Sequence, residues 1–277
     1  MTNPKALLDH FGVIPKKSLG QNFLHDPQAL EKIADAAELM PEDTVLEIGP
    51  GTGALTEVLA KRVQRVIAVE LDRRLEPIMR LTLAPYGNVE VVFDDILNVN
   101  IPELIGDQPY VVVANVPYYI TSAILRLLLE LPHAPRRIVL TVQLEVAERI
   151  IAKPGAMSLL SVSAQFYAKP KIVTRFNKAV FYPRPDVDSA VARLDVYDRP
   201  QVDVPNADVF FRVVKAGFGQ KRKQLKNAIA EGLHMEHDEA AILLEAAGID
   251  PKRRAETLSL PEWAAITRHY HASVQST

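Results

Sequence analysis

The sequence contains no cysteine among its 277 residues. That absence excludes disulfide bonds, a thiolate nucleophile and cysteine-ligated zinc or iron–sulfur clusters. The chain also has no uninterrupted run approaching the roughly 18 apolar residues that a membrane-spanning helix needs. Its first twenty residues lack the apolar core of a signal peptide and the arginine and serine bias of a transit peptide. We therefore expect a cytoplasmic protein that does not enter a membrane.

A strong excess of charge of one sign is missing as well, because the formal net charge is only −2. Bulk charge thus does not point to a nucleic-acid partner, and any such interpretation has to rest on local basic patches. Hydrophobic residues make up 48% and charged residues 24% of the chain, which is ordinary for a globular protein. The length exceeds what one compact core usually holds, so one large domain and a smaller one are expected.

Short apolar runs alternate with helical patterns between residues 44 and 142. The near-continuous valine, isoleucine and leucine runs are typical of a parallel sheet covered on both faces, and their alternation with helices predicts a doubly wound α/β fold. Beyond residue 154, the stretches LLSVSAQF, KIVTRF and SAVARLDVY are predicted as strands that extend this sheet in antiparallel fashion. A proline-containing linker, RPQVDVPNAD, then precedes four helical patterns. We expect an α/β domain over residues 1–200 and a helical domain over 204–277.

The segment VLEIGPGTGALT places Gly49, Gly51 and Gly53 between a predicted strand and a predicted helix. Glycine permits positive φ and lets a ligand approach the backbone, and the helix N-terminus offers free N–H groups. The next predicted strand ends in Glu70, where an acid can accept hydrogen bonds from both hydroxyls of a ribose. Strand, glycine turn, helix, strand and acid together predict a nucleoside-binding half-fold.

Two nucleoside ligands fit this pattern. GPGTGA satisfies the loose dinucleotide motif, so NAD is one of them. Glu47, just before the first glycine, would repel a pyrophosphate but suits the ammonium of an amino-acid moiety, which favours S-adenosylmethionine. Asp95 follows a third predicted strand and can accept a hydrogen bond from the exocyclic amine of adenine.

The apolar run YVVVAN ends in the tetrapeptide NVPY. If the carboxyl edge of the sheet holds the donor, Asn115 lies at the same edge. Its side-chain oxygen and a carbonyl beside Pro117 can accept both hydrogens of an exocyclic amine, which would direct the nitrogen lone pair toward a methyl group. Tyr118 offers a ring on which a flat base can stack, worth about 1–3 kcal/mol. Catalysis would then be positioning and electrostatics, on adenine, cytosine or a glutamine amide.

From about residue 16 to 260, the chain resembles the S-adenosylmethionine-dependent dimethyladenosine transferases of small-subunit (16S-type) ribosomal RNA. The resemblance is carried, in order, by KKSLGQNFL, EIGPGTGALT, VELD, DDIL, NVPY, VFYPRPDVDSAV and GFGQKRKQLKNAI. It implies a Rossmann-like methyltransferase sheet with a small C-terminal helical domain. It also implies that two methyl groups pass to N6 of each of two adjacent adenines near the 3′ end of 16S rRNA in the immature small ribosomal subunit, with a role in its assembly.

The resemblance further implies individual roles. Closure over the donor falls to Gln21, Asn22 and Leu24, and Phe181 would stack on the target base opposite the tyrosine. The implied donor-binding residues in the sheet are Gly49, Gly51, Glu70, Asp95 and Asn115. The implied catalytic residues are Asn115, Pro117, Tyr118 and Phe181. One departure lies on the expected RNA side, where Asp186 occupies a position at which the family usually has a lysine.

A local basic patch lies in the helical region and is opposed in that stretch only by Asp208. Its members are Arg212, Lys215, Lys221, Arg222, Lys223 and Lys226. On two predicted helices joined near Gly217 and Gly219, these side chains would form an RNA-binding face whose affinity depends on salt. Because a target base must leave its stack, unpaired or loop RNA is the expected substrate.

Alternatives remain at this point. One is a 23S rRNA dimethyltransferase of the macrolide-resistance type, although the longer helical region containing KRKQLKN favours the small-subunit type. Another is a non-catalytic RNA-binding assembly factor, against which the intact motifs argue. A third is an NAD-dependent oxidoreductase, in which NVPYY would have no task. We expect a monomer without a metal site, since His234 and His237 lie in a predicted surface turn, and we expect Trp263 to anchor the helical core.

Overall fold

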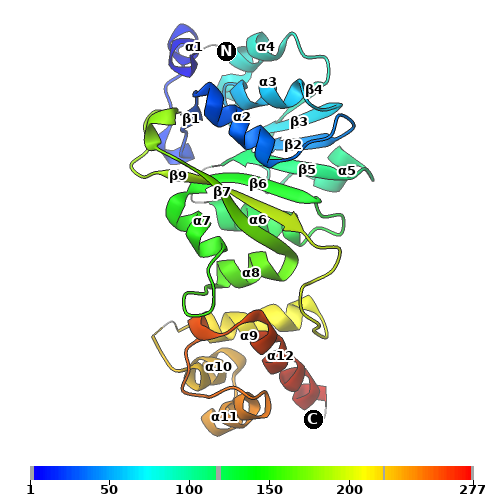
Figure 1. The fold of residues 1–277 in the computed structure, drawn as a ribbon, viewed down its shortest axis with the longest axis vertical. Coiled ribbons are helices and arrows are strands. Elements are labelled where there is room, and N and C mark those ends of the chain that lie inside the picture. Colours follow the sequence, from blue (N-terminus) through cyan, green and yellow to red (C-terminus); the bar gives the residue numbers. More distant parts are fainter. Residues whose placement is uncertain (1–2, 117–119, 221, 276–277) are drawn as a thin grey trace. The chain divides into compact units, whose positions relative to one another are not determined.

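The computed structural model describes residues 3–116, 120–220 and 222–275 (Figure 1). Contacts divide the chain into two units, one comprising Met1–Ala147 and Lys169–Val196, the other Glu148–Ala168 and Tyr197–Thr277. The last of the three crossings between the units, after Val196, lies close to the predicted linker. The segment Glu148–Ala168, which was expected in the α/β domain, clusters with the helical unit instead.

The first unit is built on a seven-stranded sheet with the order β4-β3-β2-β5-β6-β9-β7. Its strands are β2 (Thr44–Ile48), β3 (Arg65–Glu70), β4 (Val89–Phe93), β5 (Tyr110–Asn115), β6 (Arg137–Gln143), β7 (Ala168–Phe176) and β9 (Ser189–Val196). The strands from β2 to β6 pair in parallel, and β9 pairs antiparallel with β6. This confirms the predicted α/β sheet and its antiparallel extension. A separate two-stranded sheet joins β1 (Phe23–Leu24) to β8 (Phe181–Tyr182).

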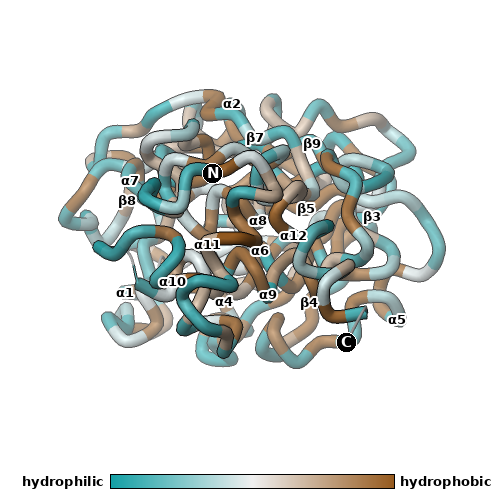
Figure 2. The backbone as a smooth tube through the Cα atoms, turned by 90° about the horizontal axis from the view of Figure 1, so that it is seen from below, coloured by the Kyte–Doolittle hydropathy of each residue, from teal (hydrophilic) through white to brown (hydrophobic). Residues whose placement is uncertain are grey.

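Helices follow the strands of this unit, as the alternating pattern predicts. They are α1 (Pro4–His10), α2 (Pro27–Ala36), α3 (Ala54–Ala60), α4 (Glu76–Leu83), α5 (Ile101–Ile105), α6 (Thr121–Leu129) and the start of α7 (Leu144–Ile150). Helices α2 and α3 bury Leu30, Ile33 and Leu59 against the valines of the central strands. Figure 2 shows the hydrophobic stretches toward the inside of the fold and hydrophilic ones in the outer loops. Burial of this kind is what holds the carboxyl ends of the parallel strands in place.

The stretch LLSVSAQF, predicted as a strand, is helix α8 (Leu159–Tyr167), so that prediction is wrong. Ser158 begins the helix through a capping box, in which its hydroxyl accepts from the backbone of Ser161 and Ser161 accepts in return. Val162 and Phe166, four residues apart, are both fully buried on one helical face. The β-forming residue types misled the prediction because burial against other helices outweighs their intrinsic preference.

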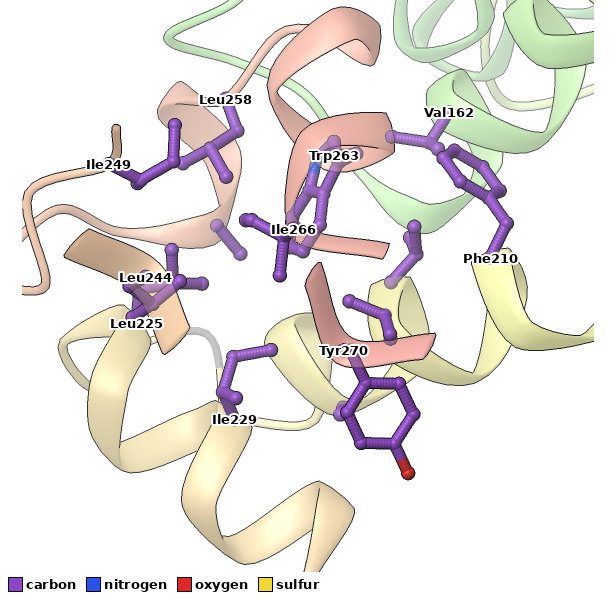
Figure 3. Packing of buried hydrophobic residues seen from close by; sticks show 14 of the residues in the cluster. Val162, Phe210, Leu225, Ile229, Leu244, Ile249, Leu258, Trp263, Ile266 and Tyr270 are labelled. Atoms are coloured by element: carbon purple, nitrogen blue, oxygen red, sulfur yellow. The ribbon is translucent and has the colours of Figure 1, made fainter. Parts of the chain in front are cut away.

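The second unit combines α8 with four later helices. These are α9 (Ala207–Phe218), α10 (Leu225–Leu233), α11 (His237–Ala246) and α12 (Leu260–Gln275). Figure 3 shows Trp263 surrounded by apolar side chains of this core, and its exposure is 0%, as expected of an anchor. Phe166 of α8 stacks on Phe210 of α9 with ring centroids 4.5 Å apart. That contact explains why α8 clusters with the helical unit rather than with the sheet.

Gly217 does not join two helices, as the sequence suggested, but lies inside α9 against the indole of Trp263. A Cβ there would lie 2.9 Å from Cζ3 of Trp263 and closer still to Cη2. Because the indole is fully buried and cannot move away, we expect Gly217→Ala to destabilise this unit by about 1–3 kcal/mol through overpacking. The gain in helix propensity, at most about 1 kcal/mol, is smaller.

The fluorescence of the single tryptophan during urea unfolding measures this effect. Gly219→Ala is the matched comparison, because its nearest neighbour would be a backbone oxygen at 3.3 Å. We expect Gly219→Ala to lower the free energy of unfolding less than Gly217→Ala does. Equal midpoints for the two variants would show that the close approach of Gly217 to Trp263 has no energetic importance.

Candidate functional site

A cavity of about 1050 Å³, including the solvent at its mouth, lies at the carboxyl edge of the parallel strands. Segments that end or follow β2, β3, β4 and β5 line it, together with residues 19–24 from the N-terminal region. This is the edge at which open α/β sheets bind their ligands. The lining includes every predicted donor-binding residue, namely Gln21, Asn22, Leu24, Gly49, Gly51, Glu70, Asp95 and Asn115.

The glycine turn needs glycine for two separate reasons. Gly49 and Gly51 adopt φ values of +73° and +62°, in the left-handed region that other residues rarely occupy. A Cβ on Gly51 would also lie 2.9 Å from the ring of Phe23, and one on Gly49 would lie 3.1 Å from the main-chain oxygen of Asn115. The turn therefore lies close against both the N-terminal region and the end of β5.

Glu70 is fixed at the end of β3 by two backbone donors. Its Oε2 accepts from the Gly51 N–H at 3.0 Å and its Oε1 from the Asp72 N–H at 2.8 Å. Burial raises the pKa of the Glu70 carboxyl, and these hydrogen bonds oppose the rise. Each carboxylate oxygen retains capacity for another hydrogen bond. The geometry thus fits the ribose-binding acid that the sequence predicts.

Glu47 lies at the inner wall of the same cavity and is 1% exposed. Its Oε2 is buried without a hydrogen-bond partner among the described residues. Burial raises the pKa of this carboxyl to about 8; the nearby Thr56 hydroxyl opposes the rise and repulsion from Glu70 adds to it. The carboxyl is therefore mostly protonated at neutral pH.

Asn115, at the end of β5, has one side of its amide already occupied. Its Nδ2 donates to the main-chain oxygen of Asn22 at 3.2 Å. Oδ1 has no hydrogen-bond partner among the described residues, and it is the atom that the predicted chemistry requires. Pro117 and Tyr118, which complete the predicted tetrapeptide, lie outside the described residues.

Side-chain hydrogen bonds that the sequence analysis did not predict attach the N-terminal region beside the cavity. Gln21 donates to Asp72 Oδ2 at 2.8 Å and accepts from the backbone N–H of Lys16. Arg74 binds Asp72 and donates to the main-chain oxygen of Ile14 at 3.1 Å. Burial acts to raise the pKa of Asp72, but hydrogen bonds from Arg74 and Gln21 outweigh it and lower the pKa. Asp72 and Arg74 are thus site-supporting residues that only the fold reveals.

Phe181, which the resemblance assigns to base stacking, is 3% exposed and packs in a cluster with Leu24, Leu30 and Val191. Its backbone pairs with Leu24, because β8 forms a ladder with β1. The tyrosine that it would face across the target base, Tyr118, lies outside the described residues, so the stacking role stays a prediction.

Two apolar residues of the cavity were not predicted. Leu71 follows the ribose-binding acid and is 48% exposed, and Ile96 follows Asp95 and is buried. Asp95 itself accepts from the Leu97 N–H through Oδ1 at 3.0 Å, which leaves Oδ2 available. Apolar walls beside an acceptor suit a flat heterocycle such as adenine. Their signal in the sequence was an apolar residue directly after each acid.

The predicted basic patch lies in the second unit. Arg212 and Lys215 are exposed on one face of α9, and Arg222 and Lys223 are exposed between α9 and α10. Lys226 is half-buried on α10, and Lys221 lies outside the described residues. The ammonium of Lys223 lies 3.6 Å from a carboxylate oxygen of Glu231, so Asp208 is not the only acid near the patch.

The described residues contain neither a metal-binding cluster nor a helix that could span a membrane. No group of three or more histidine, aspartate or glutamate side chains in residues 3–116, 120–220 and 222–275 is placed to hold a metal ion. Within the same ranges, no helix has the length and apolar character needed to cross a membrane.

The family described as "Ribosomal RNA adenine dimethylase" matches residues 14–270 of the chain. Two relatives named "Ribosomal RNA small subunit methyltransferase A" match nearly the full length. The relative from Dehalococcoides mccartyi strain CBDB1 is 44% identical over 98% of this chain and 93% of its own. That from Bacillus cereus strain B4264 is 45% identical over 95% of this chain and 94% of its own.

Solved structures agree with the fold. The 23S rRNA methyltransferase ErmE is similar with a TM-score of 0.71 and 29% identity, covering 90% of this chain and 99% of that one. A dimethyladenosine transferase from Plasmodium falciparum is similar with a TM-score of 0.76 and 25% identity, covering 91% of this chain and 98% of that one.

Proposed function

Because the chain belongs to the ribosomal RNA adenine dimethylase family, we propose that it dimethylates N6 of two adjacent adenines near the 3′ end of 16S rRNA. The chain is an S-adenosylmethionine-dependent rRNA adenine dimethyltransferase, as the sequence predicted. The observation that carries the proposal is the convergence of all eight predicted donor-binding residues on one cavity, with Asn115 at its edge.

The small subunit is favoured over the large one by similarity. Relatives named for the small subunit are 42–45% identical to this chain, whereas the 23S rRNA methyltransferase ErmE is 29% identical. ErmE has a similar fold, with a TM-score of 0.71, so the fold by itself does not decide which RNA is bound. Action on the immature subunit, a monomeric state and a cytoplasmic location stay predictions from the sequence.

The donor supplies an electrophilic methyl group, and this chain's own residues provide binding and orientation. Glu70 would hold the ribose and Asp95 the adenine of the donor, between apolar walls that include Leu71. Asn115 Oδ1 would accept a hydrogen from the N6 amine of the target, since Asn22 already occupies the amide nitrogen. Holding the amine in one orientation removes much of the entropic barrier to attack. Pro117 and Tyr118 are proposed to complete this binding as the sequence predicts.

The test is to incubate the protein with labelled S-adenosylmethionine and either immature small subunits or large-subunit RNA, and to map the modified base. Label on two adjacent adenines near the 3′ end of 16S rRNA is expected. Label confined to 23S rRNA would contradict the substrate, and a melting temperature raised by NAD but not by S-adenosylmethionine would contradict the donor.

We expect the double variant Arg212→Ala/Lys215→Ala to weaken RNA binding and flatten its salt dependence. Each phosphate contact to single-stranded RNA contributes about −0.7 to the slope of log affinity against log salt concentration, so losing two should reduce it by about 1.4. Filter binding across a salt series measures this. The matched control is Lys32→Ala/Lys61→Ala, which removes two exposed lysines of the first unit. An unchanged slope in the α9 variant would remove these residues from the RNA interface.

A further inference from the structure

The donor cavity carries an unusual set of charges. Its lining contains four acids, Glu47, Glu70, Asp94 and Asp95, and no lysine, arginine or histidine among the described residues. Asp94 and Asp95 lie near solvent, and their carboxylates accept the backbone N–H groups of Asp95 and Leu97, respectively. The two glutamates are buried. The described residues that line the cavity thus provide no cation to balance these acids.

The two buried glutamates differ in how they are satisfied. Both oxygens of Glu70 accept backbone N–H groups, from Gly51 and Asp72. Glu47, also buried, has an oxygen with no donor in the described structure. The groups that face it are the Thr56 hydroxyl of α3 and the Glu70 carboxylate of β3, and neither is a cation. A buried carboxylate without a partner is costly, so the protonated form is the stable one while the cavity holds only water.

We propose that Glu47 selects cationic ligands for this pocket: its carboxyl is neutral until a ligand's positive charge enters, and it then ionises and gives its proton to solvent. The inference rests on the proposed function, because S-adenosylmethionine carries both an ammonium and a sulfonium group. A ligand cation within a few ångströms favours the charged carboxylate and supplies the counter-charge that the protein lacks. Donor binding is thereby coupled to release of a proton from this chain.

The pKa of Glu47 sets both the number of protons released on binding and the direction in which affinity changes with pH. The pKa of about 8 means that roughly nine-tenths of the Glu47 carboxyls carry a proton at pH 7 and about half at pH 8. If the bound carboxyl is ionised throughout, about 0.9 proton leaves per donor bound at pH 7. Because Glu47 holds fewer protons in the bound state, its own contribution to affinity rises with pH, by about fivefold between pH 7 and pH 8.

Isothermal titration calorimetry at pH 7, in buffers of different ionisation enthalpy, counts the released protons. Three ligands show which charged group of the ligand causes the proton release. They are S-adenosylmethionine, S-adenosylhomocysteine and 5′-methylthioadenosine, which has the adenosine but neither the ammonium nor the sulfonium. We expect release of close to one proton with S-adenosylmethionine and none with 5′-methylthioadenosine. S-adenosylhomocysteine keeps the ammonium and is expected to release a proton as well if the ammonium is the group that Glu47 meets.

The variant Glu47→Gln keeps the shape of the side chain but has no titrating proton. It should bind S-adenosylmethionine without the extra release and without the fivefold rise in affinity between pH 7 and pH 8. The ligand's own ammonium titrates equally with both proteins, so their difference isolates Glu47. Glu42→Gln, an exposed glutamate just before the same strand, should behave as the unaltered protein.

Two outcomes overturn the inference. If the unaltered protein binds S-adenosylmethionine without releasing a proton, the inference is wrong and the proposed function remains intact. This measurement does not depend on the folding of any variant. Proton release that persists undiminished in Glu47→Gln would assign the proton to another group. If the unaltered protein binds none of the three ligands, the donor assignment fails and the inference with it.

Discussion

Asn115→Ala is expected to lower the rate of methyl transfer on the order of 10²- to 10³-fold, which is the usual effect of removing one positioned hydrogen-bonding group from an active site. The substitution removes Oδ1, the acceptor that the predicted chemistry requires, together with the Nδ2 group that donates to the Asn22 carbonyl. Because Glu70 and Asp95 would still hold the ribose and the adenine of the donor, affinity for the donor should change by no more than a few-fold. Single-turnover transfer with labelled donor measures the rate, and calorimetry measures donor affinity.

Asn98→Ala serves as the control, since Asn98 is exposed and does not line the cavity. It should retain the rate of the unaltered protein. Asn115→Asp is informative as a second variant, because it keeps an acceptor but loses the amide donor that meets Asn22. A rate for Asn115→Ala equal to that of Asn98→Ala would remove Asn115 from catalysis.

Glu70→Ala is expected to weaken donor binding by roughly 10²-fold or more. Two hydrogen bonds from the ribose hydroxyls to a carboxylate are each worth about 1.5–3 kcal/mol, and about 1.4 kcal/mol corresponds to a factor of ten. The substitution also leaves the buried N–H groups of Gly51 and Asp72 without their acceptor, which loosens the glycine turn. The rise in melting temperature caused by S-adenosylmethionine should therefore disappear.

Two comparisons make this result specific. Glu70→Gln retains an acceptor oxygen and should fall between the unaltered protein and the alanine variant. Asp107→Ala removes an exposed acid that does not line the cavity and should leave the thermal shift unchanged. Donor affinity of Glu70→Ala within threefold of the unaltered protein would refute the ribose-binding role.

The donor site was largely predictable because its signals are local. Gly49 and Gly51 lie at fixed offsets after one strand, and Glu70 and Asp95 each lie at or just after the end of another. Parallel strands bring their carboxyl ends to a common edge, so predicting the strands was enough to predict that these residues meet. Asn115 joins them for the same reason, as the last residue of β5.

Predictions failed where a side chain's environment depends on distant segments. The stretch Leu159–Tyr167 has strand-forming residue types, yet the helices of the second unit bury Phe166 and make it helical. The stacking of Phe166 on Phe210, which favours the helix, joins residues that are far apart along the chain.

The amino-acid sequence alone determined the α/β class and the meeting of the glycine turn, Glu70, Asp95 and Asn115 at one edge of the sheet, because these follow from periodicity or from spacing within a few residues. Only the tertiary structure decided which atoms of the cavity residues remain available to form hydrogen bonds with a ligand. It showed that Asn22 occupies the amide nitrogen of Asn115 and that backbone donors satisfy Glu70 but not Glu47. Burial and hydrogen-bond partners are properties of the packed environment, and no local pattern in the chain encodes them.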